Sequence, residues 1–452
     1  MSVYTGQRIV IIGAGKTGLA LTDFFLARGA RVALSDRRPA AQVPAAAELV
    51  ARGVDLDCPG HDATLLAAAD LIAISPGVAL DMPELAAAMG SGVPVLGEIE
   101  IAARELQAPM VAITGTNGKS TTTTLLGEVF GAWGKRAFVG GNLGTPLIEA
   151  TRCDDWDWIV AEISSFQLEA IDRFRPRYGL LLNLTEDHLD RYPDMAGYLS
   201  AKLRLFENMT ATDVAVINLE DPLVRQLTAN LPCLRIGFSS RGPVEAGMGF
   251  DGRHLIWRWA GRETRFAVQE LRLKGLHNIE NVMAALIPPL LEGCPADTAW
   301  RAVCAFAGLD HRMVLVRQLQ GVDWFNDSKG TNVGSVVKSL AGLPGSVTLI
   351  AGGRDKGGDY APLVEPVASK VAHLILIGEA ADRIEQALGA LTHTVRAGSL
   401  EDAVQLAYRL TEPGGAVLLS PGCSSFDMFR SYAERGEVFM RAVGELPEEA
   451  AH

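Results

Sequence analysis

The chain has 452 residues, which is more than a single hydrophobic core usually serves, so we expect two to four domains. Its formal net charge of −12 argues against a surface that binds nucleic acid or an anionic membrane. The six cysteines are scattered without a Cys-X-X-Cys pair, and no signal-type segment or apolar run of membrane-spanning length is found. These features predict a soluble cytoplasmic protein with reduced thiols, no membrane insertion and no nucleic-acid partner.

The N-terminal region is predicted to form a βαβ unit. An apolar strand at residues 8–13 runs into Gly-Ala-Gly-Lys-Thr-Gly at 13–18, and a second strand at 31–36 ends in Asp36. A G-x-G-x-x-G turn with an acid about twenty residues further on is typical of nicotinamide or flavin dinucleotide binding. The alternative is a tight turn that serves helix packing alone.

A second glycine-rich turn follows the apolar strand at residues 110–114. Its sequence is Gly-Thr-Asn-Gly-Lys-Ser-Thr at 115–121, two residues shorter between the glycines than the usual phosphate loop. The glycines let backbone N–H groups turn toward an anion. Lys119 is then placed for the β- and γ-phosphates of ATP, and the hydroxyl of Ser120 or Thr121 for Mg²⁺. The alternative is an ordinary βα turn with a solvated lysine.

The central region carries polar residues where two strands end. Glu162 lies at the end of the predicted strand 158–163, and the segment 183–190, which holds His188, ends the next strand. Carboxylates and histidine are ligands for hard or borderline metal ions, so we expect a metal site there. Lys202 lies on a predicted helix with apolar neighbours, where a lysine is normally solvated.

The alternation of strands and helices predicts an α/β protein of three domains. These are a Rossmann-like N-terminal domain, a central domain like the P-loop ATPases with a parallel sheet, and a Rossmann-like C-terminal domain. An antiparallel hairpin is expected at 255–259 and 264–268. After His311 the pattern returns to buried strands followed by helices, and the strand ends at 352–358 and 420–425 suit ligand sites. The expected domains are 1–97, 98–308 and 309–452.

Seven separated motifs resemble the Mur ligase family of peptidoglycan synthesis. They occur in the family's order, cover nearly the whole chain and include its three-domain layout. The motifs are Gly-Thr-Asn-Gly-Lys-Ser-Thr at 115–121, Glu-Ile-Ser-Ser-Phe-Gln at 162–167, Asn-Leu-Thr-Glu-Asp-His-Leu-Asp at 183–190, His-Asn-Ile-Glu-Asn at 277–281, Gly-Leu-Asp-His-Arg at 308–312, Asn-Asp-Ser-Lys-Gly-Thr-Asn at 326–332, and Ser-Pro-Gly-Cys-Ser-Ser-Phe-Asp-Met-Phe at 420–429. The chain departs from the family where Asp310 replaces the usual proline, and where Gly422 and Ser424 replace common alanines.

The resemblance implies a ligase that uses ATP and Mg²⁺ to add D-glutamate to UDP-N-acetylmuramoyl-L-alanine through an acyl phosphate. These two substrates are the partners implied, and a monomer is expected. Two alternatives are kept. A folylpolyglutamate synthase-like ligase shares the phosphate loop, and a nicotinamide-dependent oxidoreductase would use the first glycine-rich turn.

The resemblance also resolves the conflict between the two glycine-rich turns, because in this family the first domain holds the uridine diphosphate end of the substrate. The residues implied for the UDP-linked substrate are Gly15, Lys16, Thr17, Asp36, Arg37, Ser75, Gly77, Asn142 and His188. Those implied for ATP are Gly115, Thr116, Asn117, Gly118, Lys119, Ser120, Thr121, Asn278, Asn281, His311, Arg312 and Asp327. Those implied for glutamate are Thr331, Lys356, Ser425, Phe426 and Tyr432.

The implied metal ligands are Ser120, Glu162, His188 and Lys202. An ammonium beside a dication would be repelled, so a neutral Lys202 amine is favoured and can capture CO₂ as a carbamate, as the family's lysine does. The alternative is a surface lysine that pairs with Glu207 or Asp187. The residues implied for catalysis are Lys119, Glu162, His188, Lys202, Arg312 and Lys329, the last near the transferred phosphoryl group.

Overall fold

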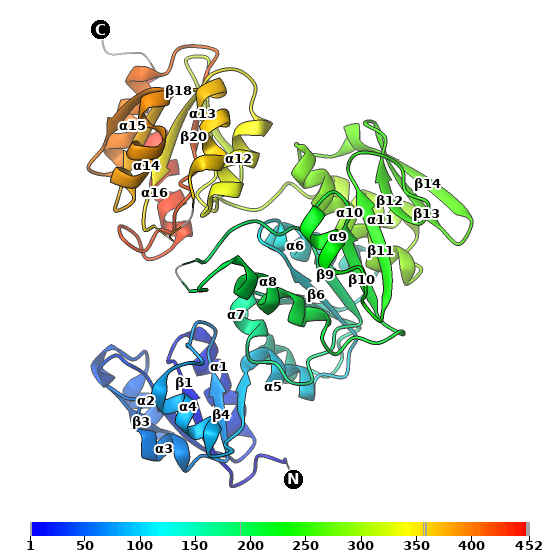
Figure 1. Cartoon of the computed structure of the whole chain (residues 1–452), viewed down its shortest axis with the longest axis vertical. Coiled ribbons are helices and arrows are strands. Elements are labelled where there is room, and N and C mark those ends of the chain that lie inside the picture. Colours follow the sequence, from blue (N-terminus) through cyan, green and yellow to red (C-terminus); the bar gives the residue numbers. More distant parts are fainter. Residues whose placement is uncertain (1, 190, 356, 358, 449–452) are drawn as a thin grey trace.

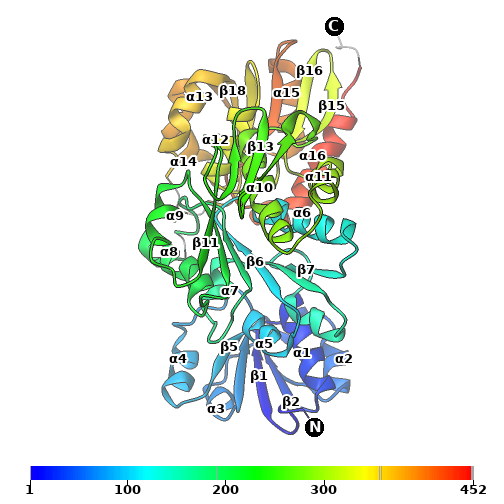
Figure 2. The ribbon, with the colours of Figure 1, turned by 90° about the vertical axis from the view of Figure 1, so that its right-hand side faces the viewer.

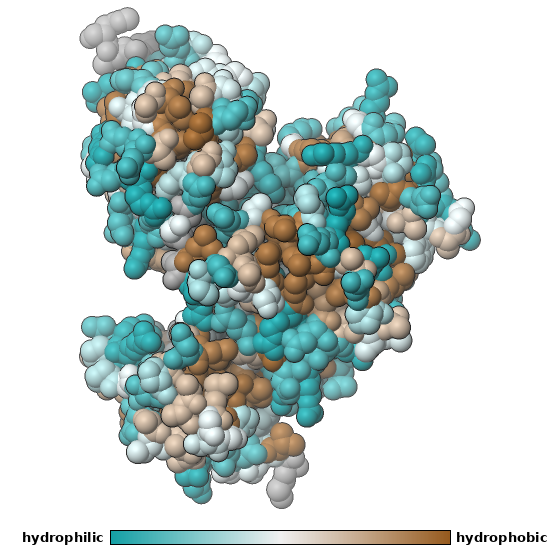
Figure 3. All heavy atoms as spheres, in the orientation of Figure 1, coloured by the Kyte–Doolittle hydropathy of each residue, from teal (hydrophilic) through white to brown (hydrophobic). Residues whose placement is uncertain are grey.

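The computed structural model describes residues 2–189, 191–355, 357 and 359–448. The chain forms three α/β units, each built on its own sheet and coloured in sequence order from blue to red (Figure 1). In the view turned by 90°, the units stand in a column with the central sheet in the middle (Figure 2). The space-filling view is hollowed between the first and third units (Figure 3). This arrangement confirms the predicted α/β fold of three units.

The first sheet is a parallel sheet with the strand order β3-β2-β1-β4-β5. Its strands are β1 (Arg8–Ile12), β2 (Arg31–Ser35), β3 (Asp55–Asp57), β4 (Leu71–Ile74) and β5 (Val95–Gly97). Its helices are α1 (Lys16–Ala27), α2 (Ala46–Ala51), α3 (Ala63–Ala67) and α4 (Pro83–Gly90). Helix α1 packs close to the turn before it, because a Cβ at Gly18 would lie 1.8 Å from the carbonyl oxygen of Gly13. Gly18 therefore serves a close approach of helix and turn, which was the alternative to dinucleotide binding for this turn.

The central sheet has nine strands in the order β14-β13-β12-β11-β10-β9-β6-β8-β7. Its strands are β6 (Met110–Thr114), β7 (Ala137–Gly141), β8 (Trp158–Glu162), β9 (Tyr178–Leu181), β10 (Val214–Asn218), β11 (Leu234–Ser239), β12 (Gly247–Phe250), β13 (His254–Trp259) and β14 (Arg262–Ala267). Its helices are α6 (Lys119–Ala132), α7 (Ser165–Leu168), α8 (Met195–Leu203), α9 (Pro222–Leu227), α10 (Leu276–Leu291) and α11 (Ala296–Ala305). The predicted hairpin is confirmed as the antiparallel pair β13–β14, and β12 also pairs antiparallel with β13. The sheet is otherwise parallel, with this antiparallel edge.

The third sheet has six strands in the order β15-β16-β20-β17-β18-β19. Its strands are β15 (Val314–Leu319), β16 (Val322–Asn326), β17 (Val347–Gly352), β18 (Val371–Ile377), β19 (His393–Arg396) and β20 (Ala416–Leu419). Its helices are α12 (Val333–Gly342), α13 (Val364–Lys370), α14 (Ala381–Leu388), α15 (Leu400–Leu410) and α16 (Tyr432–Gly444). The buried strands expected after His311 are confirmed as β17, β18 and β20, each followed by a helix, whereas the antiparallel hairpin of β15 and β16 was not predicted. Gln320 and Gly321, with φ of +52° and +77°, make its two-residue turn.

The packing joins the first two units more tightly than the third. Helix α5 (Glu98–Glu105) connects the first sheet to the central one. A single hydrophobic cluster runs through it, from Ile9 of β1 through Ile101 of α5 to Ile159 of β8. Two other clusters cover the two faces of the third sheet without residues of the central sheet. Among the described helices, none is long and apolar enough to cross a membrane.

Candidate active site

The phosphate loop lies between β6 and α6 in a conformation that glycine permits. Gly115 and Gly118 have φ of +144° and +89°, and α6 begins at Lys119. The Lys119 ammonium donates hydrogen bonds of 2.8 Å to the carbonyl oxygens of Gly115 and Thr116. The lysine therefore folds back over the loop, where it can meet a phosphate held by the N–H groups at the start of α6.

Asn183, which follows β9, is hydrogen-bonded to the backbone of the phosphate loop. Its carbonyl oxygen accepts from the N–H of Thr116 at 2.9 Å, and its side-chain oxygen accepts from the N–H of Asn117 at 2.8 Å. Its amide donates to the carbonyl oxygen of Asn117 at 3.0 Å. Asn183 was part of a motif but was given no role from the sequence. The structure shows that it fixes the loop's backbone.

Glu162 lies at the end of β8 and is 3% exposed. Its Oε1 accepts a hydrogen bond of 2.6 Å from the Asn142 amide. Its Oε2 is buried and has no hydrogen-bond partner among the described residues. A buried carboxylate oxygen without a partner is costly, and a bound cation would compensate for it. The donor therefore fits a metal ion of the kind expected from the sequence.

Lys202 of α8 is also buried against the loop, at 2% exposed. Its Nζ donates to the carbonyl oxygen of Gly115 at 3.0 Å and lies 4.8 Å from the centre of the Tyr198 ring. Burial lowers the pKa of this amine well below its ordinary value, and the charge of Lys119 lowers it further. The alternative of a solvated surface lysine is therefore wrong.

His188 lies in the loop after β9, with a φ of +58°. Its Nε2 is 3.7 Å from Oδ2 of Asp187, and its ring meets the Phe166 ring edge to face at 4.7 Å. The Tyr198 ring lies 6.5 Å from the His188 ring, so Tyr198 is a common neighbour of His188 and Lys202. In the described part of the chain, no three His, Cys, Asp or Glu residues form a metal-binding group. A metal ion here would need further oxygen ligands, such as hydroxyls or phosphates.

The third unit docks on the phosphate loop through the N-terminal end of α12. The Ser335 hydroxyl donates to Oδ1 of Asn117 at 2.7 Å. The Asn332 amide donates to the same atom at 3.3 Å and to Oδ2 of Asp187 at 3.0 Å. Asn332 also caps α12, since its side chain accepts from the Ser335 N–H at 2.9 Å. From the sequence, Asn332 belonged to a motif but was given no role, and Ser335 was not singled out, although an Asn before an apolar helical run signals a helix start.

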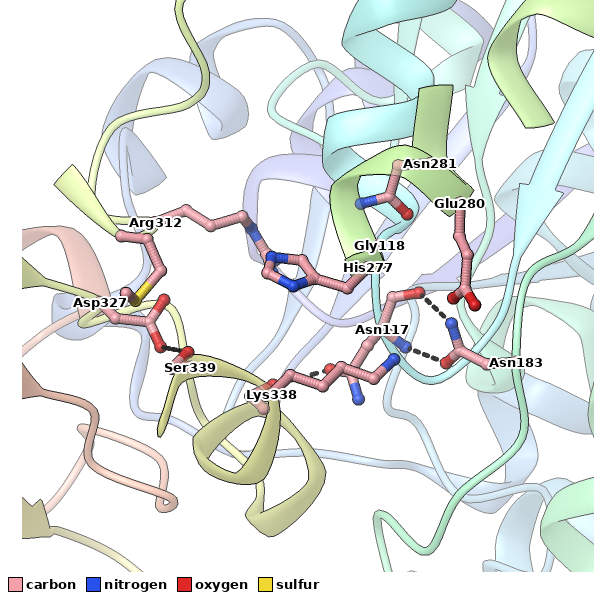
Figure 4. A pocket seen from close by; sticks show the side chains of 12 residues that line it. Asn117, Gly118, Asn183, His277, Glu280, Asn281, Arg312, Asp327, Lys338 and Ser339 are labelled. Atoms are coloured by element: carbon pink, nitrogen blue, oxygen red, sulfur yellow. Dashed lines mark hydrogen bonds between the residues drawn. The ribbon is translucent and has the colours of Figure 1, made fainter. Parts of the chain in front are cut away.

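A pocket opens beside this contact, between the central and third units. Figure 4 shows Arg312 and Lys338 extending from the third unit toward His277 and Glu280 of α10. Of the predicted ATP residues, five line this pocket: Asn117, Gly118, Asn281, Arg312 and Asp327. The other lining residues are Asn183, His277, Glu280, Met313, Ser335, Lys338 and Ser339.

Burial shifts the titration of the pocket's charged groups. It lowers the pKa of Lys338 and lowers that of His277 to about 4, helped by the nearby charges of Lys338 and Arg312. It raises the pKa of Glu280, and it raises that of Asp327 against the lowering effect of Arg312. The Nε of Arg312 is buried without a hydrogen-bond partner among the described residues. Such a set of buried donors suits an anionic, hydrogen-bonding ligand.

Asn278 and His311, both predicted for ATP, are buried. Asn278 donates to the carbonyl oxygen of Lys274 and accepts from the Asn281 amide at 3.3 Å, so it orients Asn281. His311, with a φ of +60°, is buried with its Nδ1 3.0 Å from the Asn326 amide nitrogen. Neither side chain is among the residues that line the pocket.

The residues predicted for glutamate come from several segments of the third unit. Thr331 lines a second pocket between the units, together with His188 and Tyr360. Tyr432 lies beside Lys329, whose Nζ is 5.3 Å from the ring centre. Ser425 is buried, whereas Phe426 is 66% exposed. Lys356 lies outside the described residues.

Gly422 and Ser424, which stand where the family commonly has alanine, both lie in a distinct backbone arrangement. Gly422 has a φ of +68°, a conformation that favours glycine. Ser424 and Arg354 exchange two backbone hydrogen bonds, at 2.9 and 3.1 Å. This bridge joins the two glycine-rich strand ends that the sequence singled out.

The predicted UDP site lies on the first unit and faces the central one. Asp36 accepts from the Ala14 N–H at 2.7 Å and from Arg38, whose guanidinium holds the pKa of that carboxyl well below its usual value. Lys16 reaches across to the carbonyl oxygen of Gly144 at 2.5 Å. Ser75 donates to the carbonyl oxygen of Gly13 at 3.2 Å.

The other predicted residues of this site lie around the same turn. Gly15 caps α1, and Thr17 lies in the helix's first turn. Arg37 points toward the sulfur of Met82, at 3.8 Å. Gly77 follows β4, and Asn142, on the central unit, is bound to Glu162. These residues flank one edge of the first sheet, whereas Asn142 and His188 belong to the central unit.

The fold and site together define an ATP-binding enzyme of three α/β units, in which a phosphate loop is closed over by the third unit. Family models match the chain along its length. They are the Mur ligase MurD-like N-terminal domain at residues 7–97, the Mur ligase middle domain at 113–288 and the Mur ligase glutamate ligase domain at 311–423. The chain belongs to the Mur ligase family.

Individual relatives agree with this assignment. A UDP-N-acetylmuramoylalanine–D-glutamate ligase from Syntrophotalea carbinolica is 69% identical over 446 residues, covering 99% of each chain. A ligase of the same name from Geotalea uraniireducens is 52% identical, covering 98% of each chain. A crystal structure of MurF ligase from Thermotoga maritima in complex with ADP shares the fold, with a TM-score of 0.59 and 16% identity over 98% of this chain and 95% of that one.

Proposed function

We propose that the chain is an ATP-dependent ligase that joins the L-alanyl carboxylate of UDP-N-acetylmuramoyl-L-alanine to the amine of D-glutamate. The observation that carries this proposal is the 69% identity, over 99% of both chains, to a relative named for that reaction. The site supports it, because Lys119 and Lys202 both donate to the carbonyl oxygen of Gly115 in a loop built for phosphate. The products would be the amide, ADP and phosphate, formed in the cytoplasm during peptidoglycan precursor synthesis.

We assign one substrate to each unit. Residues 1–97 would bind the UDP-linked substrate, 98–308 would bind ATP, and 309–452 would bring glutamate. Thr331, Lys356, Ser425, Phe426 and Tyr432 stay predictions for the glutamate. We also propose a monomer, which light scattering during gel filtration would check.

The reaction has two steps, and both take place at the L-alanyl carboxyl group of the substrate. The substrate carboxylate attacks the γ-phosphoryl group of ATP, and ADP leaves. The glutamate amine then attacks the acyl phosphate, phosphate leaves, and the amine loses a proton. Anionic charge develops in both steps. It would be stabilised electrostatically by three cations, which also position the reacting groups: Lys119, Lys329 and Arg312. The docked third unit excludes water, which would otherwise hydrolyse the acyl phosphate.

Mg²⁺ is the metal ion proposed for the site. Ser120 and Glu162 would hold one ion with ATP, and His188 and the carbamate of Lys202 would hold a second; the unpartnered Oε2 of Glu162 supports the first of these. When bound, the ions would neutralise charge on the phosphates.

The carbamate proposal rests on the buried, neutral-favouring environment of Lys202. The amine would add to CO₂ and release one proton, giving an anion with two oxygens. We expect Lys202→Ala to be nearly inactive and acetate to restore part of the activity. Under bicarbonate, the intact protein should gain the mass of one CO₂, and Lys202→Ala should not. A fully active Lys202→Ala would contradict the proposal.

The nicotinamide-dependent alternative is disfavoured by Asp36. In a dinucleotide site this acid accepts from the ribose hydroxyl. Here its oxygens accept from Ala14 and Arg38, so Asp36 would shape the turn of the UDP site through these contacts and would not bond a ribose hydroxyl directly. We expect calorimetry to detect UDP binding and no NADH binding, and tight NADH binding unaffected by UDP would contradict the assignment.

The proposed function is tested by ADP release in the presence of ATP, Mg²⁺, UDP-N-acetylmuramoyl-L-alanine and either enantiomer of glutamate. We expect sustained release with D-glutamate, and background release with L-glutamate or without the UDP-linked substrate. Release that requires a folate and L-glutamate would instead favour the folylpolyglutamate synthase-like alternative.

A further inference from the structure

One arginine crosses from the central unit to the first. The Arg191 guanidinium donates from Nη1 to the carbonyl oxygen of Gly77 at 2.9 Å and from Nη2 to that of Val78 at 3.1 Å. Both carbonyls belong to the turn at residues 75–78, which follows β4 and holds two of the residues expected to meet the UDP-linked substrate. A side chain of the central unit is therefore hydrogen-bonded to the backbone of this turn.

The same guanidinium is anchored in the central unit. Its Nη2 donates to Oε2 of Glu169 at 2.5 Å, and the Tyr192 hydroxyl donates to Oε1 of Glu169 at 2.6 Å. The guanidinium carbon lies 5.0 Å from the centre of the Phe166 ring. The Arg191 and Glu169 side chains are 19% and 16% exposed, so water screens this ion pair less than a surface pair.

Arg191 and its neighbours also contact His188. The carbonyl oxygen of His188 accepts from the N–H groups of Arg191 and Tyr192, both at 3.0 Å. The Phe166 ring that faces the guanidinium also meets the His188 ring at 4.7 Å. Since His188 has a φ of +58°, these contacts hold a strained position in place. Movement of Arg191 would thus displace both the turn at 75–78 and the loop of His188.

We propose that Arg191 is a positioning residue that sets the spacing between the turn at 75–78 and the loop of His188. This inference rests on the proposed function, in which the first unit holds the UDP end and the carboxylate reacts at the phosphate loop. The substrate has to span the two units, so the distance between them decides whether its carboxylate reaches the phosphoryl group. The planar guanidinium presents donors on two separate nitrogens to two carbonyls and a carboxylate, whereas a lysine would have to reach all three from a single nitrogen.

The test compares Arg191→Ala and Arg191→Lys with Arg152→Ala. Arg152 also links the central unit to the first, through an exposed ion pair of 3.3 Å with Asp23, so it is a matched control for interdomain contact in general. We expect Arg191→Ala to raise the KM for UDP-N-acetylmuramoyl-L-alanine about tenfold and to lower kcat, with the KM for ATP changed less than about twofold. Arg191→Lys should recover only part of the loss. Arg152→Ala should resemble the unchanged enzyme.

Hydrogen exchange of residues 75–79 in the enzyme without ligands gives a readout independent of turnover. We expect faster exchange there in Arg191→Ala and, to a smaller extent, in Glu169→Gln, which also serves if Arg191→Ala fails to fold. Equal rises in both KM values, or an exchange pattern like that of Arg152→Ala, would overturn the positioning role. If instead the unchanged enzyme releases no ADP with these substrates, the proposed function fails, while the exchange result still decides whether Arg191 holds the turn.

Discussion

At the scale of single residues, three lysines near the phosphate loop differ in how they are held. Lys119 is fixed by two backbone carbonyls, Lys202 is buried beneath Gly115, and Lys329 lies against the Tyr432 ring. Burial lowers the pKa of Lys202 and of Lys329, so the charged form of either amine carries a desolvation cost that a nearby anion would offset.

Lys119→Ala tests the loop's role in catalysis. Removing this cation should cost several kcal/mol of transition-state stabilisation, which is roughly 10²-fold or more in kcat. Lys135→Ala is the matched control, because Lys135 is a partly exposed lysine near the end of α6 that pairs with Asp157 at 3.5 Å. Near-normal turnover of Lys119→Ala would mean that ATP binds elsewhere.

The lowered pKa of Lys329 leads us to expect that kcat/KM for ATP depends on pH. Burial, then the charge of Arg312, lowers its pKa to about 8, so the free enzyme carries this cation below pH 8 and loses it as pH rises through 8. We expect kcat/KM for ATP to fall above about pH 8. In Lys329→Arg the fall should move to higher pH, because a guanidinium stays charged. An unchanged fall in Lys329→Arg would assign it to another group.

At the scale of elements, the start of α5 holds a buried acid. Glu98 is 2% exposed, and its Oε1 accepts from the Ile148 N–H at 2.6 Å. Burial raises the pKa of this carboxyl from 4.5 to about 7. The folded protein therefore binds more protons than the unfolded chain between these values, so this group's stabilising contribution is complete below pH 4.5 and is lost as pH rises to 7.

Glu98→Gln should remove this dependence while keeping an acceptor for Ile148. Relative to the unchanged protein, its free energy of unfolding should rise between pH 5 and pH 8 by up to roughly 3 kcal/mol. Urea unfolding across this range measures the difference. Glu48→Gln, at an exposed glutamate of α2, is the control and should show no such trend. A difference that does not change with pH would contradict the assignment.

The elements also show what the sequence could and could not predict. The glycine-rich turns, the strand ends at Glu162 and His188 and the β13–β14 hairpin follow from local patterns, and they were found. The docking of Asn332 and Ser335 on Asn117 joins residues more than 200 positions apart, so no local pattern could reveal it. The β15–β16 hairpin was missed because its turn uses Gln320, a residue seldom found at positive φ.

Burial was the hardest feature to infer from the sequence. Lys202 is a lysine on a short helix, and only its packing under the phosphate loop shows that it is enclosed. Lys338 and Glu280 were given no role, because each is an ordinary charged residue until the third unit brings α12 against α10 (Figure 4). The motif that contains His277 pointed to the right helix without showing which of its side chains face the pocket.

At the scale of the whole molecule, the first two units share a hydrophobic cluster, whereas polar contacts at the phosphate loop hold the third. Such contacts are individually weak, so they can break and reform as substrates enter and products leave. Ser335→Ala removes the 2.7 Å contact to Asn117 and should favour an open arrangement by about two- to tenfold.

Small-angle scattering of Ser335→Ala without ligands should give a larger radius of gyration, and the KM for ATP should rise a few-fold. Ser369→Ala is the control, since Ser369 is exposed on α13 and donates only to the carbonyl oxygen of Pro366 among its described contacts. If Ser335→Ala and Ser369→Ala scatter alike, then this contact does not govern closure.

The central claim is that the L-alanyl carboxylate is activated by ATP before D-glutamate attacks it. UDP-N-acetylmuramoyl-L-alanine labelled with ¹⁸O in that carboxylate tests this directly. One labelled oxygen should appear in the phosphate released, for each amide formed with D-glutamate, because the acyl phosphate keeps the bridging oxygen on phosphorus. Phosphate free of ¹⁸O, formed together with the amide, would contradict the account.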